Sequence, residues 1–211
     1  MRVSGDDIKA MTTRYRAQFV NSLSGAKSVN LVGTKNAKGQ ENLCIVSSCV
    51  HLGSDPALLG VVFRPNSVPR HSFENIEETG YFTLNHVCEG MHRQAHQSSA
   101  RYPRDVSEFE ATGLSPLYET GFHAPFVREA RVRIGLKLVE TLPIPLNGTT
   151  LVIGQIESVE LPKECVKTDG YIAIHEAGTL AVTGLDSYHS LPSIERLKYA
   201  KPEIPLEPLD I

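Results

Sequence analysis

Apolar side chains recur along this chain with two different periods. Over residues 5–20 they return every three or four positions, which predicts an amphipathic helix whose apolar stripe covers part of the core. Over residues 130–138 they alternate with polar and basic residues, which is typical of a strand with one buried and one solvated face. The chain therefore begins with a helix and continues mainly as strands.

Six segments have the β-branched and apolar composition of strands. They cover residues 28–34, 42–50, 57–64, 81–87, 130–138 and 149–161. A Lys38-Gly39 turn makes the first two a hairpin, and Asn147-Gly148 favours pairing of the last two. Residues 51–56 are expected to form a turn that ends the second strand before the third begins. So many strands, with helices only at the start and in inserts, predict a closed or partly closed antiparallel barrel.

Two regions lie outside this strand pattern. Residues 89–118 are polar, with helix-like stretches at 91–100 and 107–111, and they predict an excursion beside the barrel. Residues 200–211 contain three prolines, so we expect an extended or disordered C-terminal tail there. The whole chain, residues 1–211, is expected to be a single domain.

Charge and cysteine content narrow the class of protein. The 211 residues carry a formal net charge of -3 with a pI of about 6.2, which argues against nucleic-acid binding. No apolar run reaches the roughly 20 residues of a membrane helix, and no signal peptide is evident, so a cytoplasmic protein is expected. The four cysteines stand singly, without CxxC spacing, and are interpreted as buried thiols in a reducing compartment.

The segment from Arg64 to Ile76 leaves a strand, crosses a proline-rich loop and enters a helix at Ser72. A helix start offers free N–H groups and a partial positive charge, which suit a phosphate. The Arg70 guanidinium adds a positive charge and can donate two parallel hydrogen bonds. An ordinary capped helix beside a solvated Arg-His pair explains the same residues. On the residues alone, both interpretations stay open.

Two histidine-containing patterns allow other chemistry. His92 and His96 are four residues apart on an expected helix, a spacing compatible with zinc, but no acidic third ligand stands nearby and we expect no metal site. Tyr188-His189 could cap a binding site or simply close the barrel. No Gly-x-Ser-x-Gly elbow is present, so a hydrolase has little support.

Several short stretches, taken in order, are together similar to the flavin reductase-like, FMN-binding split-barrel family. Each stretch is short, but their order and spacing make the set specific, and they span most of a core from residue 28 to residue 190. They are Val32-Gly33-Thr34 with Gly39, Asn42-Leu43, Val46-Ser47-Ser48, Asp55 to Leu59 (DPALL), Pro69 to Ile76 (PRHSFENI), Gly80 to Asn85 (GYFTLN), Glu108-Phe109, Gly113-Leu114, Gly154-Gln155-Ile156 and Gly184 to Tyr188 (GLDSY).

The resemblance implies a Greek-key antiparallel split barrel with a few peripheral helices. It further implies a homodimer that binds FMN non-covalently near the subunit interface. The physics of small barrels agrees, because side chains fill the interior and a large planar ring must lie on the outside or rim. By the resemblance, phosphate binding is carried to Ser48, Arg70, His71 and Ser72, with Arg64 and Ser67 as further candidates, and ring or ribityl contacts to Asn42, Ser47 and Cys49.

The implied function is an FMN-dependent oxidoreductase. It would pass electrons from a reduced donor such as NAD(P)H to a second flavin, a metal complex or a partner protein. Because the isoalloxazine ring does the chemistry, no catalytic residue is assigned.

Two departures from the family pattern bear on this expectation. Relatives often have Lys-Asp-Thr where this chain has Arg70-His71-Ser72, which keeps a cation and a hydroxyl. Many NADH-dependent members have Gly-Asp-His where this chain has Asn147-Gly148-Thr149, so the histidine expected near nicotinamide is missing. A non-enzymatic FMN carrier or electron-transfer module is therefore the alternative, and a relative adapted to haem or pyridoxal phosphate is a third hypothesis.

Overall fold

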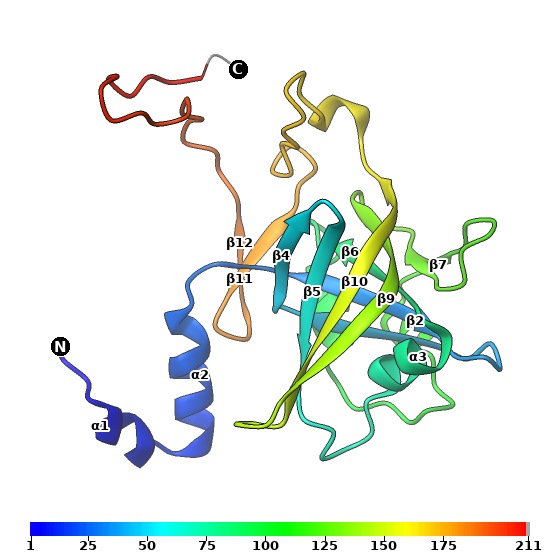
Figure 1. Cartoon of the computed structure of the whole chain (residues 1–211). Coiled ribbons are helices and arrows are strands. Elements are labelled where there is room, and N and C mark those ends of the chain that lie inside the picture. Colours follow the sequence, from blue (N-terminus) through cyan, green and yellow to red (C-terminus); the bar gives the residue numbers. More distant parts are fainter. Residues whose placement is uncertain (210–211) are drawn as a thin grey trace.

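The computed structural model describes residues 1–209 and is built around one sheet of seven strands (Figure 1). Every neighbouring pair in this sheet is antiparallel. The strands in spatial order are β3 (Glu41–Val46), β2 (Asn30–Lys35), β6 (Tyr81–His86), β9 (Arg133–Ile144), β10 (Thr149–Glu160), β5 (Ala57–Phe63) and β4 (Cys49–Ser54). The prediction of a mainly β, antiparallel fold is confirmed.

The two edges of the sheet, β3 and β4, are consecutive along the chain and are joined by Ser47-Ser48 alone. A short link between opposite edges requires the sheet to curve back on itself. Within residues 1–209, however, β3 and β4 share no ladder of hydrogen bonds. The structure is therefore a barrel left open along one seam, which is the split barrel that the sequence predicts.

Smaller elements surround this sheet. Two further sheets are formed by β1 (Lys27–Ser28), β11 (Leu180–Thr183) and β12 (Ser187–Ser190), and by β7 (Pro116–Leu117) and β8 (Phe126–Val127). The helices are α1 (Gly5–Ala10), α2 (Thr13–Leu23), α3 (His71–Thr79), α4 (His92–Gln97), α5 (Glu108–Thr112) and the 3₁₀ turn η1 (Lys163–Cys165). None of these helices is both long and apolar enough to cross a lipid bilayer.

The main core lies inside the curved sheet and under α3. Its fully buried members include Val32, Phe82, Leu136 and Val152, which come from four different strands. Gly154 lets the Phe82 ring approach the β10 backbone, because a Cβ at this position would lie 2.6 Å from the ring. Interior side chains thus fill the barrel and leave no room there for a large ligand.

The N-terminal prediction is wrong in two respects. The expected helix over residues 5–20 is broken at Met11-Thr12 into α1 and α2. A capping box between Ser4 and Asp7 begins α1. No residue of α2 is buried, and Tyr15 is 59% exposed, so the apolar stripe does not cover the core. Periodicity identifies an apolar face but does not say which surface covers it.

The expected strand over residues 42–50 is also divided. β3 ends at Val46, and Cys49 already belongs to β4. Residues 51–54, expected to be a breaker, continue β4, and only Asp55-Pro56 forms the turn into β5. The composition of this region suited one long strand, but at Ser47-Ser48 the chain passes from one edge of the sheet to the other.

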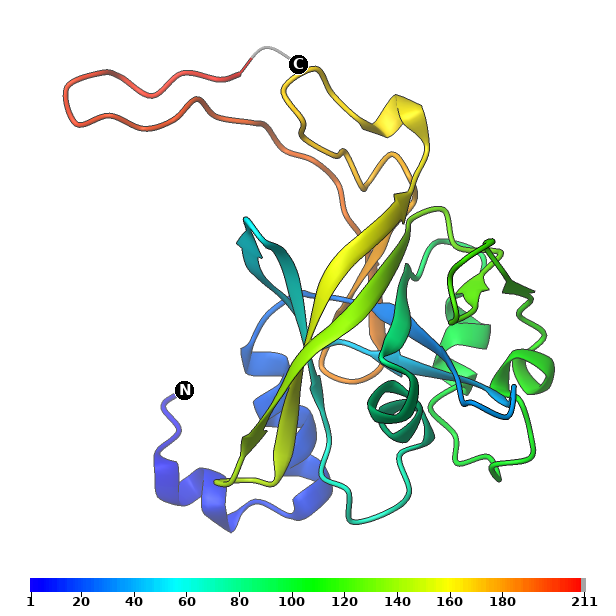
Figure 2. The same cartoon turned by 45° about the vertical axis from the view of Figure 1, so that its right-hand side comes forward.

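Other local predictions are confirmed. The strands on either side of Asn147-Gly148 pair with each other, although β9 begins later than predicted and continues to Ile144. The polar region at 89–118 contains α4 and α5. All four cysteines are free, but the prediction of buried thiols holds only for Cys88 and Cys165, because Cys44 and Cys49 are only partly buried. In Figure 2, residues 191–209 leave the barrel as a narrow arm, and residues 210–211 of the predicted tail lie outside the described part of the chain.

Candidate functional site

A cavity of about 920 Å³ opens beside the seam. It lies between α2, the Ser47-Ser48 link, the loop from β5 to α3, the loop after α4 and the turn between β11 and β12. This volume suits a ligand of cofactor size, and its position agrees with the expectation of a ligand on the rim.

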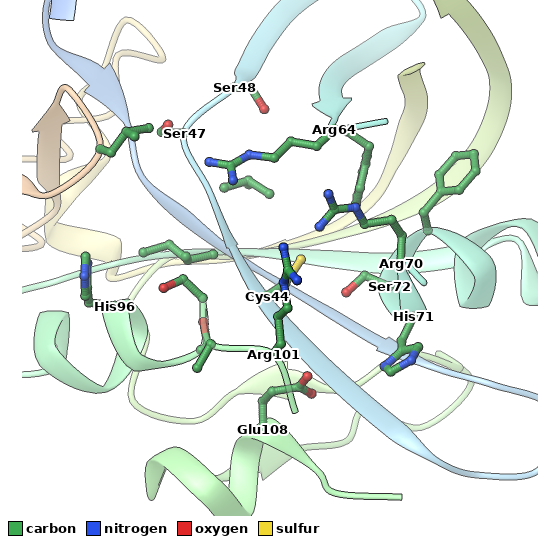
Figure 3. Close-up of a pocket in the computed structure, with 18 of the residues that line it drawn as sticks. Cys44, Ser47, Ser48, Arg64, Arg70, His71, Ser72, His96, Arg101 and Glu108 are labelled. Carbon is green, nitrogen blue, oxygen red and sulfur yellow. The ribbon is translucent and has the colours of Figure 1, made fainter. Parts of the chain in front are cut away.

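Seven of the nine residues that the sequence identifies as flavin ligands line this cavity. They are Asn42 and, labelled in Figure 3, Ser47, Ser48, Arg64, Arg70, His71 and Ser72. Ser67 and Cys49 do not line it. The Cys49 side chain packs against the barrel core instead, because Cys49 begins β4 beyond the seam. The curved sheet thus brings together residues from β3, the seam and the start of α3.

One end of the cavity has the features of an anion site. α3 begins at His71, one residue before the predicted start, and N–H groups of a first helical turn have no intrahelical acceptor. Arg70 Nε donates to the Pro65 carbonyl at 3.3 Å, and this bond holds the guanidinium near the N-terminus of α3. Figure 3 shows Arg64 and Arg70 reaching into the same space. A helix N-terminus beside two arginine guanidinium groups, each able to donate paired hydrogen bonds, suits a phosphate.

A buried hydrogen-bond chain fixes the floor of the cavity. Glu108 Oε2 accepts from Asn42 Nδ2 at 2.6 Å and from the Leu43 N–H at 3.0 Å. The Ser72 hydroxyl donates to Asn42 Oδ1. Because the Ser72 hydroxyl proton is committed to Asn42, Ser72 offers the cavity its backbone N–H and its oxygen lone pairs.

Burial shifts the pKa of two groups in this floor. It raises the pKa of the Glu108 carboxyl, whose hydrogen bonds from Leu43 and Asn42 act in the opposite direction. Burial also raises the pKa of the Cys44 thiol to about 11, so Cys44 is a neutral thiol near pH 7. The floor therefore presents the neutral Cys44 thiol, and the arginine cations stand at the anion end and the rim.

The seam itself is held by a side chain. The Ser48 hydroxyl donates to the Val62 carbonyl at 2.8 Å, and the Val62 N–H donates to the Ser48 carbonyl at 3.3 Å. These bonds attach the seam to β5, so the consecutive serines have a structural role as well as a place in the cavity wall.

The sequence analysis did not find three arginines that line the cavity, Arg14, Arg101 and Arg104. Arg104 pairs with Glu74 and donates to Asn75 Oδ1 at 2.9 Å, so it holds the loop after α4 against α3. Arg101 comes from the same loop and is exposed. Nothing in the local sequence shows that Arg104, 30 residues after Glu74, folds back to the first turn of α3.

The other end of the cavity is lined by His96 and Tyr188. His96 Nδ1 is 3.0 Å from the Tyr188 hydroxyl, and the His92 ring packs against the Tyr188 ring. Tyr188 lines the cavity, as the capping hypothesis expects, whereas His189 bonds to the hydroxyls of Thr183 and Ser187. Among residues 1–209, no group of three or more His, Cys, Asp or Glu side chains has the arrangement of a metal site.

An antiparallel barrel that is open along one seam, with a cavity beside that seam, defines a class of fold, the split barrel. Residues 24–182 match the model of the flavin reductase like domain family, and the chain belongs to this family.

Solved structures agree with this assignment. A Shewanella frigidimarina protein, assigned as a flavin reductase with a split barrel domain, is 50% identical over 95% of this chain and 100% of its own, with a TM-score of 0.92. Flavoredoxin of Desulfovibrio vulgaris is 22% identical, with a TM-score of 0.70 over 85% of this chain and 92% of its own. An FMN-binding protein from Thermus thermophilus is 18% identical, with a TM-score of 0.64 over 78% and 85%. The last two share the fold.

Proposed function

We propose that this protein is a cytoplasmic, homodimeric oxidoreductase that binds FMN in the cavity beside the seam. Membership of the flavin reductase like domain family supports a flavin-linked oxidoreductase. The observation that carries the choice of FMN is the anion site, where the first turn of α3 and two arginines surround one end of the cavity. A phosphate-bearing flavin uses this end, whereas riboflavin leaves its cations without a partner.

The residues present fit FMN. Arg64, Arg70, His71 and the Ser72 N–H would hold the phosphate, and Ser48 borders the same space. Asn42 and Ser47 would face the ribityl chain or ring, while Cys49 and Ser67 are left out of the proposed set because they do not line the cavity. Bound FMN would supply reversible acceptance of electrons.

The protein's own contribution is orientation and exclusion of water. The Glu108–Asn42–Ser72 chain holds the floor in one hydrogen-bonded arrangement. The neutral Cys44 thiol gives an uncharged surface next to it. Tyr188 and His96 close the opposite end and carry exchangeable protons there. None of these groups needs to act as a nucleophile.

A purified sample tests the cofactor. Flavin absorption in the visible spectrum, or its recovery when colourless protein is incubated with FMN, is expected. Titrations with FMN, FAD and riboflavin should rank FMN above riboflavin. Protein that shows no flavin band and binds none of the three contradicts the proposal, and a haem or pyridoxal phosphate spectrum would favour a relative adapted to another ligand.

A second candidate function, an FMN carrier or electron-transfer module, is favoured by one observation. Thr149 lines the cavity at the position where the Gly-Asp-His pattern would place a histidine. Anaerobic mixing of the FMN-loaded protein with NADH and with NADPH separates the two functions. Rapid bleaching of the flavin band supports the reductase, and no bleaching with either donor supports the carrier.

A further inference from the structure

Residues 191–209 form an arm that leaves β12 and doubles back on itself away from the barrel (Figures 1 and 2). Bridges join Leu197 to Pro208 and Lys201 to Ile204. The Lys198 N–H donates to the Glu207 carbonyl at 3.0 Å, and the Leu209 N–H donates to the Arg196 carbonyl at 2.8 Å. The arm is therefore a hairpin with its own backbone hydrogen bonds.

The hairpin has two different faces. Residues directly opposite in an antiparallel pair point to the same side, and alternate residues point to opposite sides. The bridge register thus places Lys198 with Glu207 on one face, where their side chains pair at 2.7 Å. The other face carries Leu197, Tyr199, Leu206 and Pro208, and near the turn it carries Ile204 with Lys201 directly opposite.

The apolar face has no cover in the single chain. Tyr199 is 90% exposed, and Ile204 and Leu206 are each 57% exposed. A two-stranded hairpin that buries nothing is marginally stable in water. An uncovered cluster of large apolar side chains on one face is typical of a hairpin that packs against another surface.

The base of the arm is fixed to its own body. Arg196 pairs with Asp169 at 2.5 Å, and its guanidinium lies 4.1 Å from the centre of the Tyr171 ring. Beyond this anchor the hairpin projects away from the barrel in both views (Figures 1 and 2). Its own barrel therefore does not cover the apolar face.

The barrel carries a second uncovered apolar surface. Val50, Leu52 and Leu151 gather over Gly60, where an added Cβ would lie 2.9 to 3.2 Å from their side chains. Val50 and Leu52 belong to β4, an edge strand, and are more than 40% exposed. On the next strand, Val62 lines the cavity, so this surface continues into the cavity wall.

We propose that the arm packs its apolar face against a second copy of this chain, so that two copies clasp each other reciprocally. One chain carries both an anchored apolar hairpin and an uncovered apolar edge, and a twofold pair supplies each with a partner and closes. A copy seated beside β4 and β5 also covers the flank of the cavity. This inference rests on the homodimer in the proposed function and assigns the element that holds it together.

Two double variants test the arm by sedimentation over a range of concentrations. Tyr199→Ser with Leu206→Ser alters the apolar face, and Lys198→Ser with Glu207→Ser alters the polar face of the same hairpin as a matched control. The apolar variant should raise the dimer dissociation constant at least about tenfold. The polar variant should stay within about threefold of the parent protein, since exposed ion pairs contribute little.

Fluorescence gives an independent measurement, because the chain has no tryptophan. In a Tyr199→Trp variant, emission should shift to shorter wavelength with the concentration dependence of dimer formation. A dimer whose introduced tryptophan stays solvent-exposed, and which the apolar variant does not weaken, overturns the role of the arm and leaves the dimer standing. A blue shift independent of concentration also overturns it, since the arm then packs on its own chain. A parent protein that is monomeric at every concentration refutes the homodimer itself.

Discussion

At the scale of single residues, the cavity floor depends on one amide. Asn42 accepts from Ser72 and donates to Glu108, and so joins β3 to the first turns of α3 and α5. The sequence analysis assigned Asn42 to the ring or ribityl chain and Ser72 to the phosphate. The structure shows that these two side chains are bonded to each other, so each meets a ligand with only its remaining donors and acceptors.

Arg70→Ala should distinguish binding of the flavin phosphate from binding of the rest of the flavin. Loss of charge-assisted bonds to a phosphate should weaken FMN about 10- to 100-fold and leave riboflavin within about twofold. Equilibrium titration of the apoprotein with each flavin measures both values. Arg131→Ala is the matched control, because Arg131 pairs with Glu164 and does not line the cavity. An equal loss for FMN and riboflavin would place Arg70 away from the phosphate.

Glu108→Leu and Glu108→Gln should differ in stability. Leucine leaves the Asn42 amide and the Leu43 N–H without their buried acceptor, which should cost about 2–5 kcal/mol of unfolding free energy. Glutamine can keep both bonds, because the carboxylate uses a single oxygen, Oε2, for them. Urea unfolding measures both changes, and equal losses in the two variants would contradict this role of the oxygen.

The pH dependence of Glu108→Gln tests the burial of the carboxylate. Burial raises the pKa of Glu108 above its usual value of 4.5. The native state then holds this proton more tightly than the unfolded state, so the contribution of Glu108 to stability is complete below 4.5 and is lost as pH rises through the raised pKa. The unfolding free energy of Glu108→Gln minus that of the parent protein should therefore increase from about pH 4 to pH 7, because the parent loses stability over this range and the variant does not. A difference that stays flat or falls over this range would show that the carboxylate is not destabilised by burial.

At the scale of elements, β2 can lie close to the segment before β8 only because Gly33 has no side chain. A Cβ at Gly33 would lie 2.2 Å from the Pro125 carbonyl oxygen and 2.6 Å from Thr83 Oγ1. A backbone carbonyl cannot move aside as a flexible side chain can. Gly33→Ala should cost about 3 kcal/mol by denaturant unfolding, at the upper end of the range for overpacking. Gly5→Ala, with no atom within 4 Å of the added Cβ, is the control and should be neutral or slightly stabilising.

The elements also show where sequence patterns lead to correct predictions. The β9–β10 pair and the start of α3 depend on alternation, a turn and a helix entry among neighbouring residues, and they are found within a few positions of their predicted places. The segment from residue 42 to residue 54 was misread, because its strand composition continues through the seam. Composition reports that residues suit a strand, whereas pairing decides which edge of the sheet they join.

At the scale of the whole molecule, bound FMN should stabilise the fold. A ligand at 100 times its dissociation constant adds about 2.7 kcal/mol to the unfolding free energy. For a chain of this length, the melting temperature should rise by about 5–10 °C. Riboflavin at the same concentration should give a smaller shift, because it lacks the phosphate. A melting temperature unchanged by saturating FMN would contradict binding to the native state.

The sequence by itself determined the class of fold and the family, and it identified most of the residues that the structure brings together around the start of α3. These features depend on short-range chemistry, namely alternation of side chains, turn residues and a helix start with adjacent cations. The tertiary structure alone decided which residues that are far apart in the sequence come into contact. It brought Glu108 to Asn42 across 66 positions, Arg101 and Arg104 into the cavity, Tyr188 to its far end, and it left the apolar face of the arm uncovered. Such contacts depend on the order of strands in the sheet and the paths of loops, which no local pattern of residues specifies.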